Sequence, residues 1–183
     1  MPAPPASAPQ APIIVTATIG PADLAWADGL RRAHFPPERN RLPAHLTLFH
    51  HLPPSLLGEV KRLLSGEART ATQPAARVAR LISLGRGVAL AVDSPGLIAI
   101  RARLAEALHG ALTPQDEAGW RPHITIQNKV SPTEARALLQ ALRQDFAPRP
   151  IAITGLALHW YRGGPWEPIA GYGFSRSGLF RRS

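Results

Sequence analysis

The chain divides into short segments in which apolar side chains recur either at every second position or at every third and fourth position. Alternation among β-branched residues predicts strands, and the longer period predicts helices with one buried face. In the first half these patterns predict a strand at 13–19, a helix at 21–33, a strand at 45–49, a helix at 53–64 and a strand at 78–84. Gly85-Arg86-Gly87 predicts a tight turn into the next strand.

The second half follows the same order of elements. Its patterns predict a strand at 88–92, a helix at 95–112, a strand at 123–127, a helix at 131–146 and a strand at 151–161, with one additional strand at 166–174. Ser131 and Glu134 have the spacing of a capping box, which supports a helix start at this point. The order strand, helix, strand, helix, strand therefore occurs twice.

A duplicated unit of this length predicts a domain with two lobes. Because each helix has to cover one face of a sheet, we expect an α+β fold with pseudo-twofold symmetry, in which antiparallel-rich sheets line a central cleft. The domain is expected to span residues 13–174, with the lobe boundary near Arg86. Residues 1–12 have the composition of a disordered Pro/Ala-rich tail, and residues 175–183 that of a basic tail.

Composition excludes several classes of protein. The apolar share of 45% is typical of a soluble globular domain, and no apolar run is long enough to span a membrane. The absence of cysteine excludes disulfides, thiolate metal sites and cysteine nucleophiles. The first residues lack the pattern of a signal peptide. We expect a cytoplasmic protein that acts as a monomer and does not bind membranes.

The formal net charge of +9 favours an anionic partner, such as RNA or a small phosphoester. All but two of the basic residues are arginine, the exceptions being Lys61 and Lys129. Abundant arginine, alanine and proline are also typical of a GC-rich genome. Charge alone therefore leaves the partner open.

Two predicted strands carry the same pattern of histidine, apolar residue, threonine and apolar residue, 78 residues apart. Since side chains alternate between the faces of a strand, His45 shares a face with Thr47, and His123 shares a face with Thr125. Residues two apart lie about 6.6 Å from each other, close enough for both to contact one phosphate group. A single histidine of this kind is usually structural, but the matched pair indicates a shared site.

Two imidazoles and two hydroxyls suit the cleavage of a phosphodiester, in which the nucleophile loses a proton and the leaving oxygen gains one. Imidazole, with an ordinary pKa of about 6.5, can act as base or as acid near neutral pH. The threonine hydroxyls can donate hydrogen bonds to the non-bridging oxygens. We expect no metal or other cofactor, because His50 and His51 face opposite ways and no carboxylate lies within the motif.

By the same alternation, Phe49, His51, Gln127 and Lys129 are expected to extend the site face. Phe49 is predicted to stack on a base, as aromatic side chains do in sequence-tolerant RNA binding. Lys129 and Arg121 are predicted to hold a second phosphate. Three residues of the last hairpin are expected at the rim of the cleft: Arg162, Trp166 and Tyr172.

The chain resembles the two-histidine phosphoesterase superfamily, specifically its 2′-5′ RNA ligase-like members, which include RNA 2′,3′-cyclic phosphodiesterases. The resemblance rests on Pro43-Ala44-His45-Leu46-Thr47-Leu48 and on Trp120-Arg121-Pro122-His123-Ile124-Thr125-Ile126. The segment Trp160-Tyr161-Arg162-Gly163-Gly164-Pro165-Trp166 is similar to the terminal hairpin of the family. The resemblance to this family implies a bilobal fold, catalytic roles for His45 and His123, and phosphate binding by Thr47 and Thr125. It also implies metal-independent action on a 2′,3′-cyclic phosphate or a 2′-5′ linkage.

Three functions stay open at this point. One is hydrolysis or joining of RNA ends, the second is a noncatalytic RNA- or nucleotide-binding module, and the third is a phosphodiesterase acting on a small nucleotide metabolite. The paired histidines favour an enzyme, since permanently charged side chains would serve binding better. Members of the family often carry a basic residue just after the second motif, where this chain has Gln127-Asn128. The sequence leaves open which histidine is the base.

Overall fold

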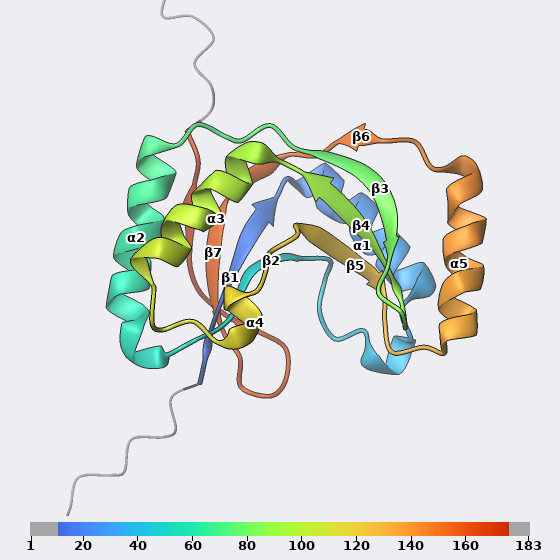
Figure 1. Cartoon of the computed structure of the whole chain (residues 1–183), viewed down its shortest axis with the longest axis horizontal. Coiled ribbons are helices and arrows are strands. Elements are labelled where there is room, and N and C mark those ends of the chain that lie inside the picture. Colours follow the sequence, from blue (N-terminus) through green and yellow to red (C-terminus); the bar gives the residue numbers. More distant parts are fainter. Residues whose placement is uncertain (1–10, 176–183) are drawn as a thin grey trace, which may run out of the picture.

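The computed structural model describes residues 11–175 and forms an α+β fold (Figure 1). Within these residues the strands are β1 (Ile13–Ile19), β2 (Leu46–Leu52), β3 (Arg77–Ser83), β4 (Val88–Asp93), β5 (His123–Gln127), β6 (Arg149–Pro150), β7 (Ile153–Trp160) and β8 (Glu167–Gly173). The α-helices are α1 (Pro21–His34), α2 (Leu57–Thr70), α3 (Pro95–Ala107), α4 (Pro114–Glu117) and α5 (Pro132–Asp145). The tails predicted at 1–12 and 175–183 lie almost wholly outside the described residues.

The described strands form two antiparallel four-stranded sheets, one with the order β2-β1-β7-β8 and the other with the order β5-β4-β3-β6. The two orders correspond, because β1, β2 and β3 occupy in the first repeat the places of β4, β5 and β7 in the second. Each sheet therefore contains the first two strands of one repeat and the third strand of the other. This arrangement confirms the predicted pseudo-twofold α+β fold.

The lobe boundary predicted near Arg86 does not divide the two sheets. Strand β3 precedes Arg86 but belongs to the second sheet, whereas β7 and β8 follow it and belong to the first. The reason is the tight turn at residues 84–87, which pairs β3 with β4 and so places the third strand of the first repeat in the other lobe. The two lobes are interleaved along the chain.

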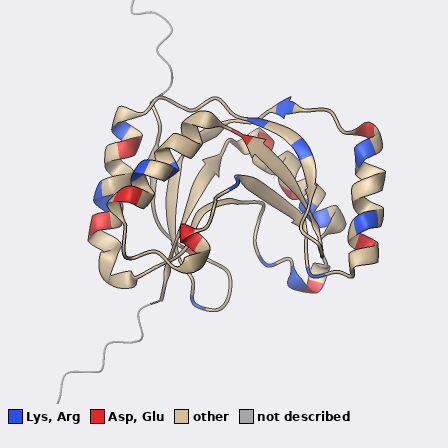
Figure 2. Cartoon of the chain, viewed as in Figure 1, with Lys and Arg blue, Asp and Glu red and all other residues tan. Residues whose placement is uncertain are grey.

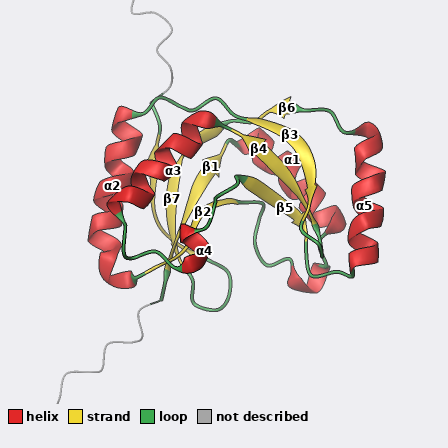
Figure 3. Cartoon of the chain, in the orientation of Figure 1, coloured by secondary structure: helices red, strands yellow, loops and turns green. Residues whose placement is uncertain are grey.

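Helices cover the outer face of each sheet, and the strands lie between them (Figure 3). Helix α1 packs against β5, and α5 packs against β3 and β4, while α2 packs against β7, β8 and α3. Helix α3 ends at Ala107 and not at the predicted residue 112, because the chain turns at Gly110, whose φ of +83° favours glycine. The capping box predicted at Ser131 and Glu134 is present at the start of α5.

The two motif strands bury their aliphatic side chains as the alternation predicts. Leu46 and Leu48 in β2, and Ile124 and Ile126 in β5, are completely buried in the core. Their neighbours on the other face, including His45 and Thr125, are only half-buried. The alternation therefore separates a core face from a site face in both strands.

The predicted alternation of core and site side chains ends after the motif threonine, Thr47 in β2 and Thr125 in β5. The pairing shifts between Thr47 and Phe49 in β2, and between Thr125 and Gln127 in β5, as it does at a β-bulge. The extra residue turns the following side chain inward, so Phe49 is completely buried and Gln127 is 8% exposed. The prediction that Phe49 and Gln127 extend the site face is therefore wrong.

Candidate active site

Both motif histidines are held in the same way. The Nδ1 atom of His45 donates a hydrogen bond of 2.8 Å to the carbonyl of Pro43, and Nδ1 of His123 donates one of 2.8 Å to the carbonyl of Arg121. A carbonyl can only accept, so each neutral ring carries its proton on Nδ1 and leaves the lone pair of Nε2 unoccupied. The duplicated motif thus gives two imidazoles with the same tautomer and the same free nitrogen.

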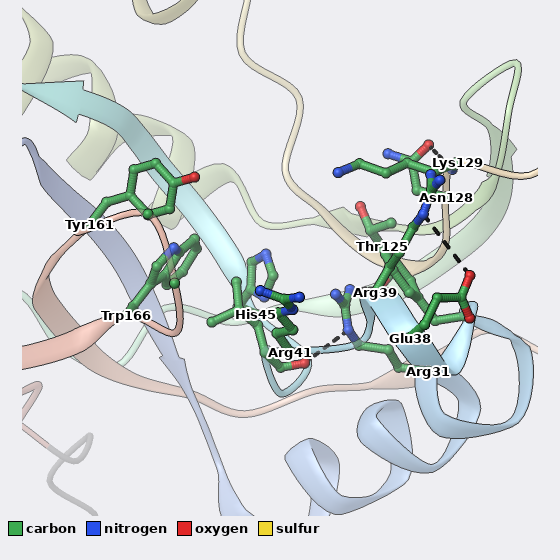
Figure 4. A pocket seen from close by; sticks show the side chains of 14 residues that line it. Arg31, Glu38, Arg39, Arg41, His45, Thr125, Asn128, Lys129, Tyr161 and Trp166 are labelled. Atoms are coloured by element: carbon green, nitrogen blue, oxygen red, sulfur yellow. Dashed lines mark hydrogen bonds and ion pairs between the residues drawn. The ribbon is translucent and has the colours of Figure 1, made fainter.

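A pocket of about 460 Å³ lies between the two lobes. Its walls include His45, directly before β2, and Thr125 on β5, which lie on different sheets (Figure 4). The side chain of Lys129 also lines the pocket. Three of the predicted catalytic and substrate-binding residues therefore meet in one cavity: His45, Thr125 and Lys129.

Three other predicted residues, Thr47, Arg121 and His123, are not among the residues that line this pocket. His123 is half-buried on β5, and its charge contributes to the environment of His45. Thr47 is half-buried and pairs across the sheet with Thr16 of β1. Arg121 is exposed and does not line the pocket, and its contribution is the carbonyl that orients His123. The side chain of Arg121, predicted to hold a second phosphate, therefore does not line the pocket.

Burial lowers the pKa of His45 to about 4. The hydrogen bond with the Pro43 carbonyl acts in the opposite direction, while the positive charges of Arg31, His123 and His50 lower the pKa further. At neutral pH the ring is therefore uncharged, and its Nε2 atom can accept a proton.

Aromatic side chains from the β7–β8 hairpin line one side of the pocket. The ring centroid of Trp166 lies 4.7 Å from that of His45, and Tyr161 is 45% exposed. Figure 4 shows both rings on the side of His45 away from Thr125. The prediction for Trp166 at the rim is confirmed. Arg162 instead pairs with Glu167, and Tyr172 packs against the core.

Cationic side chains from several segments also line the pocket. Besides Lys129, the pocket is lined by Arg31 from α1 and by Arg39 and Arg41 from the loop before β2, alongside one carboxylate, Glu38. The outer helices α2 and α5 carry both signs of charge (Figure 2). The pocket thus has a local excess of positive charge, as an anion-binding site requires.

Lys129 has a backbone φ of +61°, in the left-handed region that residues other than glycine rarely adopt. Its backbone N–H donates a hydrogen bond of 2.7 Å to the side-chain oxygen of Asn128, which supports this conformation. Lys129 lies two residues after the end of β5, and its strained backbone conformation places the exposed lysine side chain at the pocket.

Each motif strand is the edge strand of its sheet, and each edge is bound by the opposite half of the chain. The indole Nε1 of Trp120, just before the second motif, donates a 3.0 Å hydrogen bond to the carbonyl of Thr47. Arg31, from the helix that precedes the first motif, donates a 2.9 Å bond from Nη1 to the carbonyl of Thr125. These reciprocal bonds hold the two motif strands at a fixed separation.

Asp116 of α4, for which the sequence suggests no partner, is 1% exposed and binds the far end of β2. It accepts hydrogen bonds from the backbone N–H groups of His50 and His51 and from Nδ1 of His50. Burial raises the pKa of the carboxyl, but these hydrogen bonds outweigh it and leave the pKa below its ordinary value. Asp116 therefore anchors this end of β2 through the side chain of His50 and the backbone N–H groups of His50 and His51.

Among residues 11–175, no group of three or more histidine, aspartate or glutamate side chains lies close enough to hold a metal ion. No helix in the same range is long and apolar enough to cross a lipid bilayer.

Several solved structures share this fold. The TT0787 protein of Thermus thermophilus matches with a TM-score of 0.63 at 16% identity, over 91% of this chain and 100% of that chain. The LigT protein of E. coli, complexed with 3′-AMP, matches with a TM-score of 0.53 at 21% identity, over 92% and 100%. A protein described as a phosphoesterase matches with a TM-score of 0.55 at 24% identity, over 92% and 100%.

A comparison with curated proteins finds no match. The family model of the 2′-5′ RNA ligase superfamily matches residues 20–165, a range that includes both histidine motifs, all of the second sheet, and β2 and β7 of the first. The chain therefore belongs to the 2′-5′ RNA ligase superfamily.

Proposed function

We propose that this protein is a metal-independent phosphodiesterase that acts on an RNA-type phosphodiester, either a 2′,3′-cyclic phosphate or a 2′-5′ linkage. The observation that carries the proposal is the matched pair of histidines, each with Nδ1 bonded to a backbone carbonyl and Nε2 free. General acid–base cleavage needs two such groups, one on each side of the phosphorus. Membership of the superfamily supports the same chemistry.

In this proposal His45 is the base and His123 the acid during hydrolysis of a cyclic phosphate. His45 is uncharged at neutral pH, so its Nε2 can take a proton from the attacking water. The protonated ring of His123 then gives a proton to the leaving ribose oxygen. The bond between phosphorus and the water oxygen forms as the P–O bond within the cyclic phosphate breaks, and the product is a phosphomonoester. Proton exchange with solvent then returns the two imidazoles to their starting protonation states.

The remaining predicted residues hold the phosphate and the nucleoside. The hydroxyls of Thr47 and Thr125 donate to non-bridging oxygens, where negative charge builds up in the transition state. Lys129 binds an adjacent phosphate at the cationic end of the pocket. Trp166 and Tyr161 take over the base-stacking role that the sequence predicts for Phe49. E. coli LigT has been solved with 3′-AMP, ATP, NADP+ and phosphate, which supports a nucleotide substrate.

A substrate panel tests this function directly. The protein is incubated with 2′,3′-cyclic mononucleotides, 2′-5′ dinucleotides and oligoribonucleotides ending in a 2′,3′-cyclic phosphate, and the products are identified by chromatography and 31P NMR. Turnover of the oligonucleotides alone identifies an RNA-end enzyme, and turnover of mononucleotides identifies a small-metabolite enzyme. Binding of RNA without turnover of any phosphodiester would leave the noncatalytic module as the function.

We expect the activity to persist without divalent ions. The two threonine hydroxyls and the cationic wall already supply donors to the developing charge, and the described residues contain no cluster of metal ligands. The rate in millimolar EDTA should equal the rate in untreated buffer. Loss of activity in EDTA that one added metal restores would contradict this expectation.

The acid side of the pH profile should reveal the depressed pKa of His45. The ring loses its proton at a pH of about 4, so kcat/KM should fall only as pH drops through that value, well below the range of an ordinary histidine. The measurement is kcat/KM across the acid and neutral range, with unfolding monitored by circular dichroism at each pH. An acid limb near the ordinary histidine pKa of about 6.5 in the folded enzyme would show that His45 is not the base.

A further inference from the structure

Arg31 is a buried cation whose orientation the fold fixes completely. Only 4% of the residue is exposed. Its Nε atom donates to the side-chain oxygen of Asn40 at 2.8 Å and to the carbonyl of Leu42 at 3.0 Å, and Nη1 donates to the carbonyl of Thr125 at 2.9 Å. The guanidinium carbon lies 4.0 Å from the centroid of the Phe35 ring. The side chain is therefore held rigidly between α1, the loop before β2, and β5.

None of these partners carries a negative charge. Within residues 11–175, Arg31 forms no salt bridge, and the carboxylate of Asp28 on the same helix is bound to Arg32 and to the backbone N–H of Ala44. Burial lowers the pKa of the Arg31 guanidinium, and the charge of Asp28 opposes this shift. An arginine stays protonated even so, and a buried charge without a counter-ion is unfavourable. The fold thus retains an uncompensated positive charge.

That charge faces the pocket. Arg31 lines the same cavity as His45 and Thr125, and Figure 4 shows its guanidinium between those two side chains. Nη2 makes no hydrogen bond with residues 11–175 and is not fully buried, so its two N–H groups can donate to a ligand. The sequence gives no signal for this role, because Arg31 and Arg32 are adjacent on one helix and only the fold distinguishes the buried one.

We propose that Arg31 binds the reacting phosphate, with the Nη2 N–H groups donating to a non-bridging oxygen held between the two motif histidines. This inference rests on the function proposed above and adds a catalytic residue to it. Charge on the non-bridging oxygens increases as the nucleophile approaches phosphorus, so a fixed guanidinium stabilises the transition state more than the ground state. Arg39, Arg41 and Lys129 are exposed and supply a general attraction, whereas Arg31 supplies a directed contact.

The first test measures binding of inorganic phosphate to the full-length protein by NMR, independently of turnover. Titration should shift the Nε–Hε signal of Arg31 and the ring signals of His45 and His123 together, with one dissociation constant. Arg31→Met should weaken phosphate binding by roughly 10-fold or more, the size expected for a hydrogen bond to a charged group. Arg31→Lys keeps the positive charge but lacks the forked donors of the guanidinium, so its phosphate affinity should lie between those of the wild type and Arg31→Met.

Arg32→Met is the matched control, because it removes the same charge from an exposed neighbour on α1 and should leave phosphate binding nearly unchanged from wild type. Arg31→Met should also raise the pKa of His45 in an NMR titration, since the Arg31 charge is one of the causes that lower it. If Arg31→Met does not fold, the wild-type titration still decides the question.

Two results separate this inference from the function on which it rests. Phosphate binding that shifts Arg31 without turnover of any phosphodiester would leave Arg31 as an anion-binding residue and remove the proposed reaction. Unchanged phosphate affinity and unchanged kcat/KM in folded Arg31→Met would remove the role of Arg31 and leave the reaction intact. Phosphate that shifts the histidine signals but not those of Arg31 would also overturn it.

Discussion

His45→Ala and His123→Ala should each lower kcat/KM on a 2′,3′-cyclic phosphate by on the order of 100-fold or more, the usual range for removal of a general acid or base. Each ring is held by its own carbonyl bond, at the same distance and from the same position in the motif. Neither ring can take over the other role, because one proton has to be accepted as another is donated. The measurement is steady-state kinetics on the substrate that the panel identifies.

The matched control for these variants is His109→Ala, which removes an exposed imidazole just after the end of α3 and should leave kcat/KM nearly unchanged from wild type. Circular dichroism and urea unfolding establish that each variant is folded. Wild-type activity in folded His45→Ala or His123→Ala would return that histidine to a structural role.

Phe49→Ala should lower the free energy of unfolding by about 3–5 kcal/mol, the cost of removing a fully buried phenyl ring and leaving a cavity. The ring is completely buried, and the guanidinium of Arg101 lies 4.5 Å from its centroid. Substitution therefore removes both core packing and a cation–π contact with a buried arginine. Urea denaturation followed by circular dichroism measures the change.

Two further variants distinguish this structural role from the base-stacking role predicted from the sequence. Phe49→Leu keeps most of the apolar volume and should leave KM unchanged, because the side chain does not reach the pocket. Tyr161→Ala removes an exposed aromatic ring and should change the free energy of unfolding by less than about 0.5 kcal/mol. A large increase in KM for folded Phe49→Leu would show that Phe49 contacts the substrate.

The sequence predicts the core of each lobe well because local alternation decides it. Leu46 and Ile124 are buried and their histidine neighbours face the other way, since a strand has no other way to arrange them. The helix start at Ser131 is equally local, because the capping box needs only residues three apart. Patterns that involve only neighbouring residues can be recognised from the sequence without knowledge of the fold.

The sequence cannot predict features that depend on contacts between distant segments. The bulges that bury Phe49 and Gln127 arise from pairing with β1 and β4, not from the motif strands alone. The burial of Asp116 depends on the backbone of His50 and His51, which lie far earlier in the chain. The placement of β3 and β7 in different sheets likewise depends on strand pairing, and the local sequence pattern does not indicate which strands pair.

The double variant His45→Ala/His123→Ala tests most directly whether the two motifs form one catalytic unit. If the base and the acid act in a single step, the second substitution removes little that the first has left, so the double variant should be little slower than the slower single variant. The measurement is kcat/KM for the wild type, both single variants and the double variant on a cyclic-phosphate substrate in EDTA, with folding verified. Losses that multiply, so that the double variant is slower by the product of the two single effects, would show that the histidines act independently.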